Sequence, residues 1–311
     1  MFQQFKRPKV TVVGSGATGA TTAHIAALKG LGDIVLLDVV EGIPQGKALD
    51  IWESGAIEGF DGRVVGTNDY ADTAGSDIVV ITAGMPRKPG MSRDDLLKVN
   101  AGIVHDVAAA AAQHSPDAII VVLTNPADVM TFVAQQATGF PHHRVLGQAG
   151  VLDSARFRTF LADALGVSPK DVSAFVMGGH GDAMVPLVRY SFAGGIPVEK
   201  LLPKAQIDEI VQRTRVGGGE IVNLMKMSAY YAPGSSLGAM LASILHDERR
   251  ILPVIAYLNG EYGERDIYVG VPAILGGNGV ERVLEVDFTD EERVMFQKSV
   301  DSVRGPLALV K

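Results

Sequence analysis

The chain has 311 residues, of which 47% are hydrophobic and 20% are charged, with a formal net charge of −7 and no cysteine. This composition is typical of a globular protein with room for two packed lobes, and the acidic balance argues against nucleic acid or an anionic membrane as the main partner. The absence of cysteine excludes disulfides, thiolate zinc sites, iron–sulfur clusters and a cysteine nucleophile, while the absence of a secretory-signal pattern and of an apolar run of about 18 residues predicts a cytoplasmic protein without a membrane helix.

The first half of the chain alternates short apolar runs with helical segments. Strands are predicted at residues 10–13, 34–37, 78–82 and 119–123, and helices at residues 21–28 and around the alanine-rich segment 104–112. Continuous apolar strands separated by helices are typical of a parallel sheet that is covered on both faces. The predicted fold class is therefore α/β, a Rossmann-type doubly wound parallel sheet, in which ligands bind beyond the carboxyl ends of the strands.

The second half is less regular and predicts an α+β substrate or catalytic domain. Helices are predicted at residues 153–165, 204–227, 235–246 and 290–307, and strands at residues 174–177, 252–258 and 267–271. The change of pattern near residues 147–150 divides the chain into two predicted domains, residues 1–147 and 148–311.

The first glycine-rich loop has the pattern of a dinucleotide-binding turn. Gly14-Ser15-Gly16-Ala17-Thr18-Gly19 follows the first strand and opens a helix, so its glycines allow a tight turn and close approach to a pyrophosphate. Asp38 ends the second strand, 19 residues after the last glycine, which is the spacing of a carboxylate that accepts hydrogen bonds from the adenosine ribose. Its charge would repel a 2′-phosphate, and Val39 and Val40 offer no cation, so the predicted cofactor is NAD rather than NADP. A strand–turn–helix without a ligand is the alternative.

The loop after the third predicted strand, AGMPRKPGMSR, carries two arginines six positions apart, Arg87 and Arg93. Its prolines and glycine predict an irregular backbone. Arginine binds carboxylates in a bidentate way and keeps its charge at all relevant pH values. Two such groups on one loop predict a substrate with more negative charge than a monocarboxylate.

A histidine in a glycine-rich turn is the candidate acid/base. His180 lies in GGHGD after a predicted strand, and its neutral and protonated forms are both accessible near neutral pH. For most of the seven histidines a solvated or structural role is the ordinary interpretation. Asp153 and Arg156, three positions apart, share one helical face. They form either a surface ion pair or a site in which Asp153 orients a histidine and Arg156 binds a carboxylate, and the sequence leaves both open.

Two asparagines are further candidates. Asn125, in Thr124-Asn125-Pro126, follows a buried strand and could donate a hydrogen bond to a substrate oxygen or cap a turn. Asn100 ends a predicted helical turn, for which capping is the plain explanation.

Together these motifs resemble the lactate/malate dehydrogenase family over residues 10 to about 307, with all motifs in the family's order. The motifs that carry the resemblance are GSGATG, Asp38, AGMPRKPGMSR, TNPAD, GQAGVLDSARFR and GGHGD. Within the family the sequence is most similar to the bacterial malate dehydrogenases of the lactate-dehydrogenase-like type. The resemblance implies reversible NAD-dependent oxidation of the dicarboxylate (S)-malate to oxaloacetate, without a metal, by a homotetramer or a homodimer.

The resemblance also implies roles for the catalytic residues. His180, paired with Asp153, would donate and accept the proton, and Arg156 would bind the C1 carboxylate. Arg93 would polarise the reacting carbonyl when its loop closes. Arg87, where the lactate branch has glutamine, would bind the second carboxylate.

The remaining implied contacts concern the cofactor. Asn125 would contact both substrate and nicotinamide, while Asn100 and the backbone of Leu123, Thr124 and Asn125 would line the NAD site. The bond between Asn125 and Pro126 is cis in relatives. The segment 231–236, where the lactate branch has a threonine beside the substrate, matches loosely, so no contact is assigned there.

Three other functions are alternatives to this interpretation. A lactate or other 2-hydroxyacid dehydrogenase would use the same chemistry, but Arg87 argues against a monocarboxylate. A non-catalytic NAD-binding sensor would have no use for His180, Arg156 and the arginine loop together. A related glycosidase that uses NAD and a metal would rely on cysteine, which this chain lacks.

Overall fold

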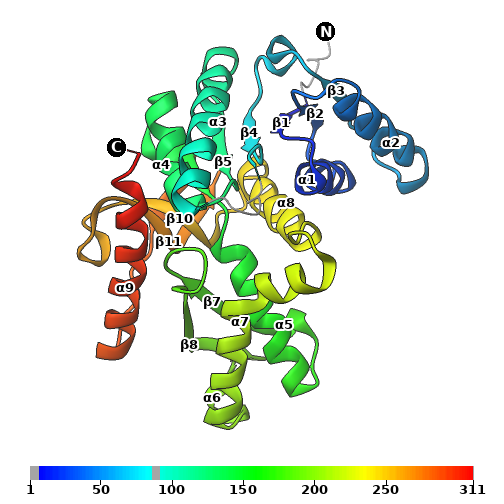
Figure 1. Ribbon diagram of the computed structural model, residues 1–311. Coiled ribbons are helices and arrows are strands. Elements are labelled where there is room, and N and C mark those ends of the chain that lie inside the picture. The colour runs from blue at the N-terminus through cyan, green and yellow to red at the C-terminus, as the bar shows by residue number, and fades with distance from the viewer. Residues whose placement is uncertain (1–6, 86–91, 311) are drawn as a thin grey trace.

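The computed structural model describes residues 7–85 and 92–310 (Figure 1). Arg87 lies in the segment 86–91, outside the described residues, and only the backbone of Arg93 is described. The described residues form a large mixed sheet with helices on both faces and a small second sheet in the second half of the chain. The predicted α/β class is confirmed.

The parallel part of the large sheet comes from the first half of the chain. Its strands are β1 (Lys9–Val13), β2 (Asp33–Leu37), β3 (Val64–Thr67), β4 (Ile78–Ile81), β5 (Ile119–Val122) and β6 (Val145–Gly147). Their order is β3-β2-β1-β4-β5-β6, the doubly wound order in which the chain changes direction between β1 and β4. The loops after these two strands therefore border one crevice.

The four strands predicted in this half agree with β1, β2, β4 and β5 to within one residue at each end. These strands are almost completely buried, so their side chains form the continuous apolar runs that the sequence shows. β3 and β6 were not predicted. β3 is only partly buried and contains Gly66, and β6 has only three residues, so neither gives such a run.

Helices cover both faces of the parallel strands. They are α1 (Ala17–Leu28), α2 (Ile43–Glu58), α3 (Arg93–His114) and α4 (Ala127–Thr138), with short 3₁₀ turns η1 (Tyr70–Thr73) and η2 (His142–Arg144). α3 packs against α4 on one face, and α1 packs against α2 and α8 (Tyr231–Leu245) on the other (Figure 1). α3 begins at a capping box in which Ser92 and Asp95 bond each other's backbone N–H groups.

Strands from the second half extend the same sheet. They are β10 (Arg250–Asn259), β11 (Arg265–Gly276) and β12 (Gly279–Val283), all antiparallel to their neighbours. β10 joins β6 through the pairing of Ile255 with Gly147. The sheet is therefore continuous across the point where the sequence predicts the change of domain.

The rest of the second half forms a lobe beside the carboxyl ends of the parallel strands. Its elements are α5 (Gly150–Leu165), η3 (Pro169–Asp171), β7 (Val172–Met177), β8 (Val185–Ala193), β9 (Ile196–Pro197), α6 (Val198–Leu201), α7 (Lys204–Met225), η4 (Glu261–Gly263) and α9 (Asp290–Leu307). A separate apolar core, which includes Phe157 and Leu161 of α5, joins α5 to the small sheet and α7. The predicted helix α9 is confirmed at both ends.

Three helix ends in this half differ from the prediction by two residues or more, and one of them is the start of α5, which lies at Gly150 rather than at residue 153. α7 ends at Met225, because Lys226 takes a left-handed conformation with φ of 60°. α8 begins at Tyr231 rather than at residue 235, because Pro233 lies in the first turn, where its missing N–H has no helical partner to lose.

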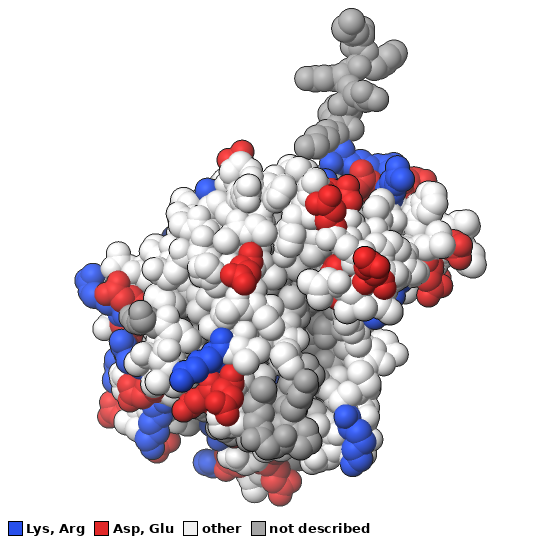
Figure 2. All heavy atoms as spheres, turned by 45° about the horizontal axis from the view of Figure 1, so that its top comes forward, with Lys and Arg blue, Asp and Glu red and all other residues white. Residues whose placement is uncertain are grey.

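The surface charge, the character of the helices and the grouping of acidic and histidine side chains show which kinds of partner the described residues could bind. On the face seen in Figure 2, lysine and arginine alternate with aspartate and glutamate in small groups, without a broad basic patch. Among the described helices, none has the length and apolar character to cross a membrane. The described part of the chain also contains no group of three or more histidine or acidic side chains suited to a metal ion.

Candidate active site

The loops after β1, β4 and β5 meet at the carboxyl edge of the sheet and are joined by hydrogen bonds. Thr82 Oγ1 donates to the carbonyl of Gly14 at 3.0 Å, and Thr124 Oγ1 donates to the carbonyl of Ala83 at 2.6 Å. These side chains hold the three loops together at the edge of the sheet where the strand order predicts the crevice.

The glycine loop leaves space for an anion at the start of α1. Gly14 has a φ of 101°, and a Cβ there would lie 2.7 Å from the backbone nitrogen of Ala83, so only glycine suits this turn. A Cβ at Gly16 would meet nothing within 4 Å, and no side chain caps α1. The first N–H groups of α1 are therefore open to a bound phosphate, as the NAD interpretation requires.

Asp38 is fixed beside this loop. Ser15 donates to Asp38 Oδ2 from its backbone N–H at 2.6 Å and from its hydroxyl at 2.8 Å, and Val40 N–H donates to Oδ1 at 3.1 Å. Burial disfavours the charged form, but the hydrogen bonds from Ser15 and Val40 outweigh it and lower the pKa of Asp38. A carboxylate that stays ionised suits ribose hydroxyls and repels a 2′-phosphate, which agrees with NAD.

Lys47 also belongs to this region, although the sequence did not single it out. Its Nζ donates to the carbonyl of Ser15 at 2.6 Å from α2. A lysine one helix away from the glycine loop has no motif of its own, so only the fold shows the contact.

Asn100 does not cap a helix, and that interpretation was wrong. It lies inside α3 and is buried, with its Oδ1 accepting from Met85 N–H at 2.8 Å and its Nδ2 donating to Asn125 O at 2.9 Å. Asn100 thus joins the loop after β4 to the loop after β5, at the place where the resemblance expects the cofactor. The peptide bond between Asn125 and Pro126 is cis, and Leu123 N–H continues the strand pairing by donating to Ile81 O at 2.9 Å.

His180, Asp153 and Arg156 come together in one buried group. Asp153 is 2% exposed, with its Oδ2 2.8 Å from His180 Nδ1 and its Oδ1 3.1 Å from Arg156 Nη1. α5 follows β6 directly, and His180 follows β7, which packs against α5. The surface ion pair is therefore excluded, and the alternative in which Asp153 orients the histidine matches the geometry.

The charges around His180 favour its protonated form. The negative charge of Asp153 raises the pKa of His180, and burial opposes this effect only in part. Because Nδ1 faces Asp153, the other ring nitrogen, Nε2, is the one left for a substrate. A histidine with one fixed nitrogen and one open nitrogen is suited to transfer a proton.

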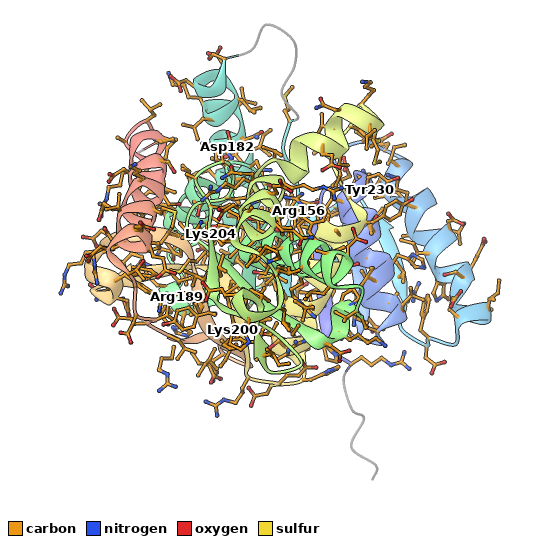
Figure 3. The ribbon with its side chains drawn as sticks, turned by 90° about the horizontal axis from the view of Figure 1, so that it is seen from below. Arg156, Asp182, Arg189, Lys200, Lys204 and Tyr230 are labelled. Atoms are coloured by element: carbon orange, nitrogen blue, oxygen red, sulfur yellow. The ribbon has the colours of Figure 1, made fainter. Side chains whose placement is uncertain are left out.

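Arg156 projects from α5 toward the glycine run of α7 and is labelled in Figure 3. Its side chain is 13% exposed, and its Nη1 bonds Asp153. A Cβ at Gly218 would lie 3.6 Å from Nη2 and 3.7 Å from Nη1 of Arg156. The guanidinium therefore packs against the backbone of α7, and a methyl group at Gly218 would be in van der Waals contact with its terminal nitrogens.

Asp128 is a residue that the sequence reasoning missed. It lies in the first turn of α4, 5% exposed, and its Oδ2 accepts a hydrogen bond from His180 N–H at 3.0 Å. The motif TNPAD was recognised, but the partner of its aspartate lies 52 positions further along the chain. No local pattern could have shown this contact.

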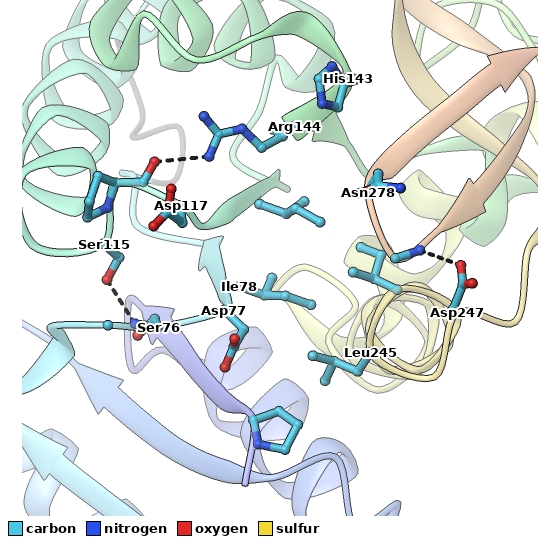
Figure 4. Close-up of a pocket in the computed structure, with 16 residues that line it drawn as sticks. Ser76, Asp77, Ile78, Ser115, Asp117, His143, Arg144, Leu245, Asp247 and Asn278 are labelled. Carbon is cyan, nitrogen blue, oxygen red and sulfur yellow. Dashed lines mark hydrogen bonds between the residues drawn. The ribbon is translucent and has the colours of Figure 1, made fainter. Parts of the chain in front are cut away.

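A second hollow, of about 590 Å³, lies at the opposite, amino edge of the sheet (Figure 4). Two of its charged residues bond to backbone groups around the hollow. Arg144 Nη1 donates to Pro116 O at 2.9 Å, and Asp247 Oδ1 accepts from Gly277 N–H at 2.8 Å. We assign no ligand to it.

Two family models match the chain. The first, lactate/malate dehydrogenase, NAD binding domain, matches residues 8–147. The second, lactate/malate dehydrogenase, alpha/beta C-terminal domain, matches residues 150–309. The chain therefore belongs to the lactate/malate dehydrogenase family of NAD-dependent oxidoreductases.

The particular relatives are named malate dehydrogenases. One from Desulforudis audaxviator is 59% identical over 97% of this chain and 98% of its own length, and one from Geobacillus kaustophilus is 59% identical over 98% and 99%. The structure of malate dehydrogenase from Salinibacter ruber is 51% identical, with a TM-score of 0.94 and coverage of 97% of each chain.

A lactate dehydrogenase has the same fold. The Cryptosporidium parvum enzyme, solved with lactic acid and NAD, is 43% identical, with a TM-score of 0.95 and coverage of 99% of each chain. The fold alone therefore does not separate the two substrates.

Proposed function

We propose that this protein catalyses the reversible NAD-dependent oxidation of (S)-malate to oxaloacetate. The observation that carries the chemistry is the buried group in which Asp153 bonds both His180 and Arg156 beside the NAD crevice. The substrate is supported by the curated malate dehydrogenases that are 59% identical over nearly the whole chain and by the arginine pair of the loop after β4.

The proposed roles follow the positions of the side chains. In the oxidative direction neutral His180 takes the hydroxyl proton on Nε2, and Asp153 stabilises the imidazolium that forms. Bound NAD accepts the hydride from C2, and the protein supplies position and electric field. Arg156 binds the C1 carboxylate in bidentate fashion.

Arg87 and Arg93 complete the proposal. Arg93 stabilises negative charge on the reacting oxygen, and Arg87 binds the second carboxylate. With pyruvate in the site Arg87 has no anion to bind, and an unpaired buried charge costs several kcal/mol, so discrimination of about 10³-fold is expected. Asn125 contacts substrate and nicotinamide, while the glycine loop, Asp38 and Asn100 hold the rest of the cofactor.

The test is the initial rate of NADH oxidation with oxaloacetate and pyruvate in parallel. A strong preference for oxaloacetate supports the proposal. A preference for pyruvate would keep the fold and the role of His180 but replace malate with lactate. Tight NADH binding without turnover of either substrate would favour the alternative of a non-catalytic NAD-binding sensor.

We further propose a homo-oligomer, a tetramer or a dimer, with residues 1–147 as the NAD-binding domain and residues 148–311 as the substrate domain, located in the cytoplasm. Apolar side chains on α2 support self-association, because Leu49 and Trp52 are 51% and 50% exposed and Ile57 is 86% exposed. Light scattering after size-exclusion chromatography measures the oligomer, and a monomer at working concentrations would contradict it.

A further inference from the structure

Three consecutive backbone N–H groups hold the segment that carries His180, and each donates to a different element. The pairs are Gly178 N–H to Gly270 O of β11 at 2.7 Å, Gly179 N–H to Ser299 Oγ of α9 at 2.7 Å, and His180 N–H to Asp128 Oδ2 of α4 at 3.0 Å. Of these acceptors, only the side chain of Asp128 is a carboxylate.

A buried carboxylate is an energetically unfavourable acceptor for a backbone N–H group, because burial removes the charge from water. Asp128 is 5% exposed, and its second oxygen, Oδ1, has no hydrogen-bond partner among the described residues. A buried carboxylate with an unsatisfied oxygen destabilises the folded state, whereas the hydroxyl of Ser299 accepts a neighbouring N–H without any charge. A neutral acceptor would be sufficient for this hydrogen bond, so the negative charge of Asp128 needs a separate explanation.

The groups around His180 explain what the charge does. In the described part of the chain, Asp153 and Arg156 of α5 and Asp128 of α4 are the charged groups that act on the imidazole. Arg156 bonds Asp153 and offsets part of its negative charge. No cation bonds Asp128 among the described residues, so its charge remains available to the imidazolium.

The titration order is consistent with this role. Burial raises the pKa of Asp128 to about 6, with the His180 N–H bond opposing the rise. The charge of Asp153 raises the pKa of His180 above its ordinary value of 6.5, and Asp128 contributes in the same direction. The pKa of Asp128 thus lies below that of His180, and the ionised form of Asp128 is the one that stabilises the imidazolium.

We propose that Asp128 is a second positioning carboxylate for His180, which fixes the histidine through its backbone N–H and supplies negative charge to the imidazolium. This inference rests on the proposed function of His180 as the acid/base. Asp153 holds the ring from one side, and Asp128 holds the backbone of the same residue from another element.

The decisive comparison is between Asp128→Asn and Ser299→Ala. Asp128→Asn keeps an oxygen that can accept the His180 N–H but removes the charge, whereas Ser299→Ala removes a neighbouring backbone contact without changing any charge. The pKa of His180 is measured by NMR titration of its ring protons in the full-length protein without substrate, with His180→Asn used to assign the signal. This readout does not depend on enzymatic activity.

We expect Asp128→Asn to lower the pKa of His180 and Ser299→Ala to leave it unchanged. In the pH profiles of kcat/KM, the acid limb of malate oxidation and the alkaline limb of oxaloacetate reduction then both move to lower pH in Asp128→Asn only. Loss of the negative charge that stabilises the imidazolium lowers kcat/KM by about 10- to 100-fold in Asp128→Asn, whereas slight misplacement of the histidine lowers it by about tenfold in Ser299→Ala. The Kd of NADH stays at the wild-type value in both.

An unchanged pKa of His180 in folded Asp128→Asn would overturn the proposal. If that variant does not fold, Asp128→Ser supplies a smaller uncharged acceptor, and Asp128→Glu, which keeps the charge, should restore most of the pKa of His180. A wild-type protein without activity on oxaloacetate would overturn the proposed function, while the NMR titration would still decide the role of Asp128.

Discussion

The NAD crevice and the pocket of His180 are built in different ways. The crevice consists of loops that follow strands of the parallel sheet, and it presents glycines, backbone N–H groups and the carboxylate of Asp38. The pocket consists of charged side chains from α4, α5 and the segment after β7, which are largely buried and bonded to one another. The crevice is suited to bind NAD through the shape and N–H groups of its backbone. The pocket of His180 is suited to stabilise charge through its ionised side chains.

This difference predicts that substitutions separate two measurements. Changes in the crevice should alter the Kd of NADH and leave the pH dependence of turnover alone. Changes in the pocket should alter kcat, KM and the pH profile while NADH still binds.

The largest effect is expected for His180→Asn. Asparagine cannot exchange a proton as imidazole does, so kcat should fall by about 10³- to 10⁴-fold. The Kd of NADH, followed by fluorescence titration, should stay at the wild-type value. A fully active His180→Asn enzyme would remove the acid/base assignment.

Arg87→Gln tests the choice of substrate. Removing the proposed partner of the second carboxylate should shift the ratio of kcat/KM for oxaloacetate over pyruvate by about 10²- to 10³-fold toward pyruvate. Lys88→Gln removes a cation from the same loop and should leave the ratio nearly unchanged. Equal ratios in wild type and Arg87→Gln would contradict the specificity argument.

The glycine run of α7 allows a finer test at Arg156. None of Gly217, Gly218 and Gly219 has a positive φ, so alanine suits the helix and stabilises it by up to about 1 kcal/mol. A Cβ at Gly218 would lie 3.6 and 3.7 Å from the terminal nitrogens of Arg156 and 3.9 Å from its Cζ, while a Cβ at Gly219 meets nothing within 4 Å.

Gly218→Ala should therefore raise the KM for oxaloacetate by about tenfold with little change in kcat, because it crowds the carboxylate site. Gly219→Ala is the matched control and should raise only thermal stability. If the two variants have the same KM, the bare face beside Arg156 has no role in binding.

The smallest effect is expected at Asp38. Asp38→Asn should raise the Kd of NADH by about five- to tenfold through weaker ribose hydrogen bonds, with kcat retained. Glu41→Gln, an exposed charge three positions away, should not change it.

The pH dependence of the two regions should also differ. Because the folded pKa of Asp38 lies below its ordinary value of 3.8, its contribution to stability is complete above that value and is lost as pH falls through the folded pKa. The Kd of NADH should therefore show no titration of Asp38 between about pH 6 and 8. kcat/KM should titrate in that range with His180. If the Kd of NADH changed with pH in the same range as kcat/KM, the two regions would be electrostatically coupled.

The same difference explains which parts could be predicted from sequence. The crevice comes from contiguous motifs, so the strands β1, β2, β4 and β5, the glycine loop and Asp38 were all placed correctly. Asn100 was misread, because its partners Met85 and Asn125 lie on two other loops.

The pocket depends on contacts between distant segments. His180 and Asp153 lie 27 positions apart, so the residues alone left their pairing as one of two alternatives, and only the family resemblance implied it. The anchoring of Gly179 by Ser299 spans 120 positions and could not be predicted by any local rule. The start of α8 was missed because Pro233 and Gly234 look like a break when their place in the first helical turn is unknown.

The continuous sheet determines whether the NAD-binding part of the chain can be separated from the rest of the protein. β6 lies between β5 and β10, so a fragment cut after residue 147 would expose a new strand edge and the apolar side chains that β10 and β11 now cover. Unprotected edges of this kind promote aggregation between copies. We therefore expect that a fragment containing only the NAD-binding region needs a substitute for β10 and β11 to stay soluble.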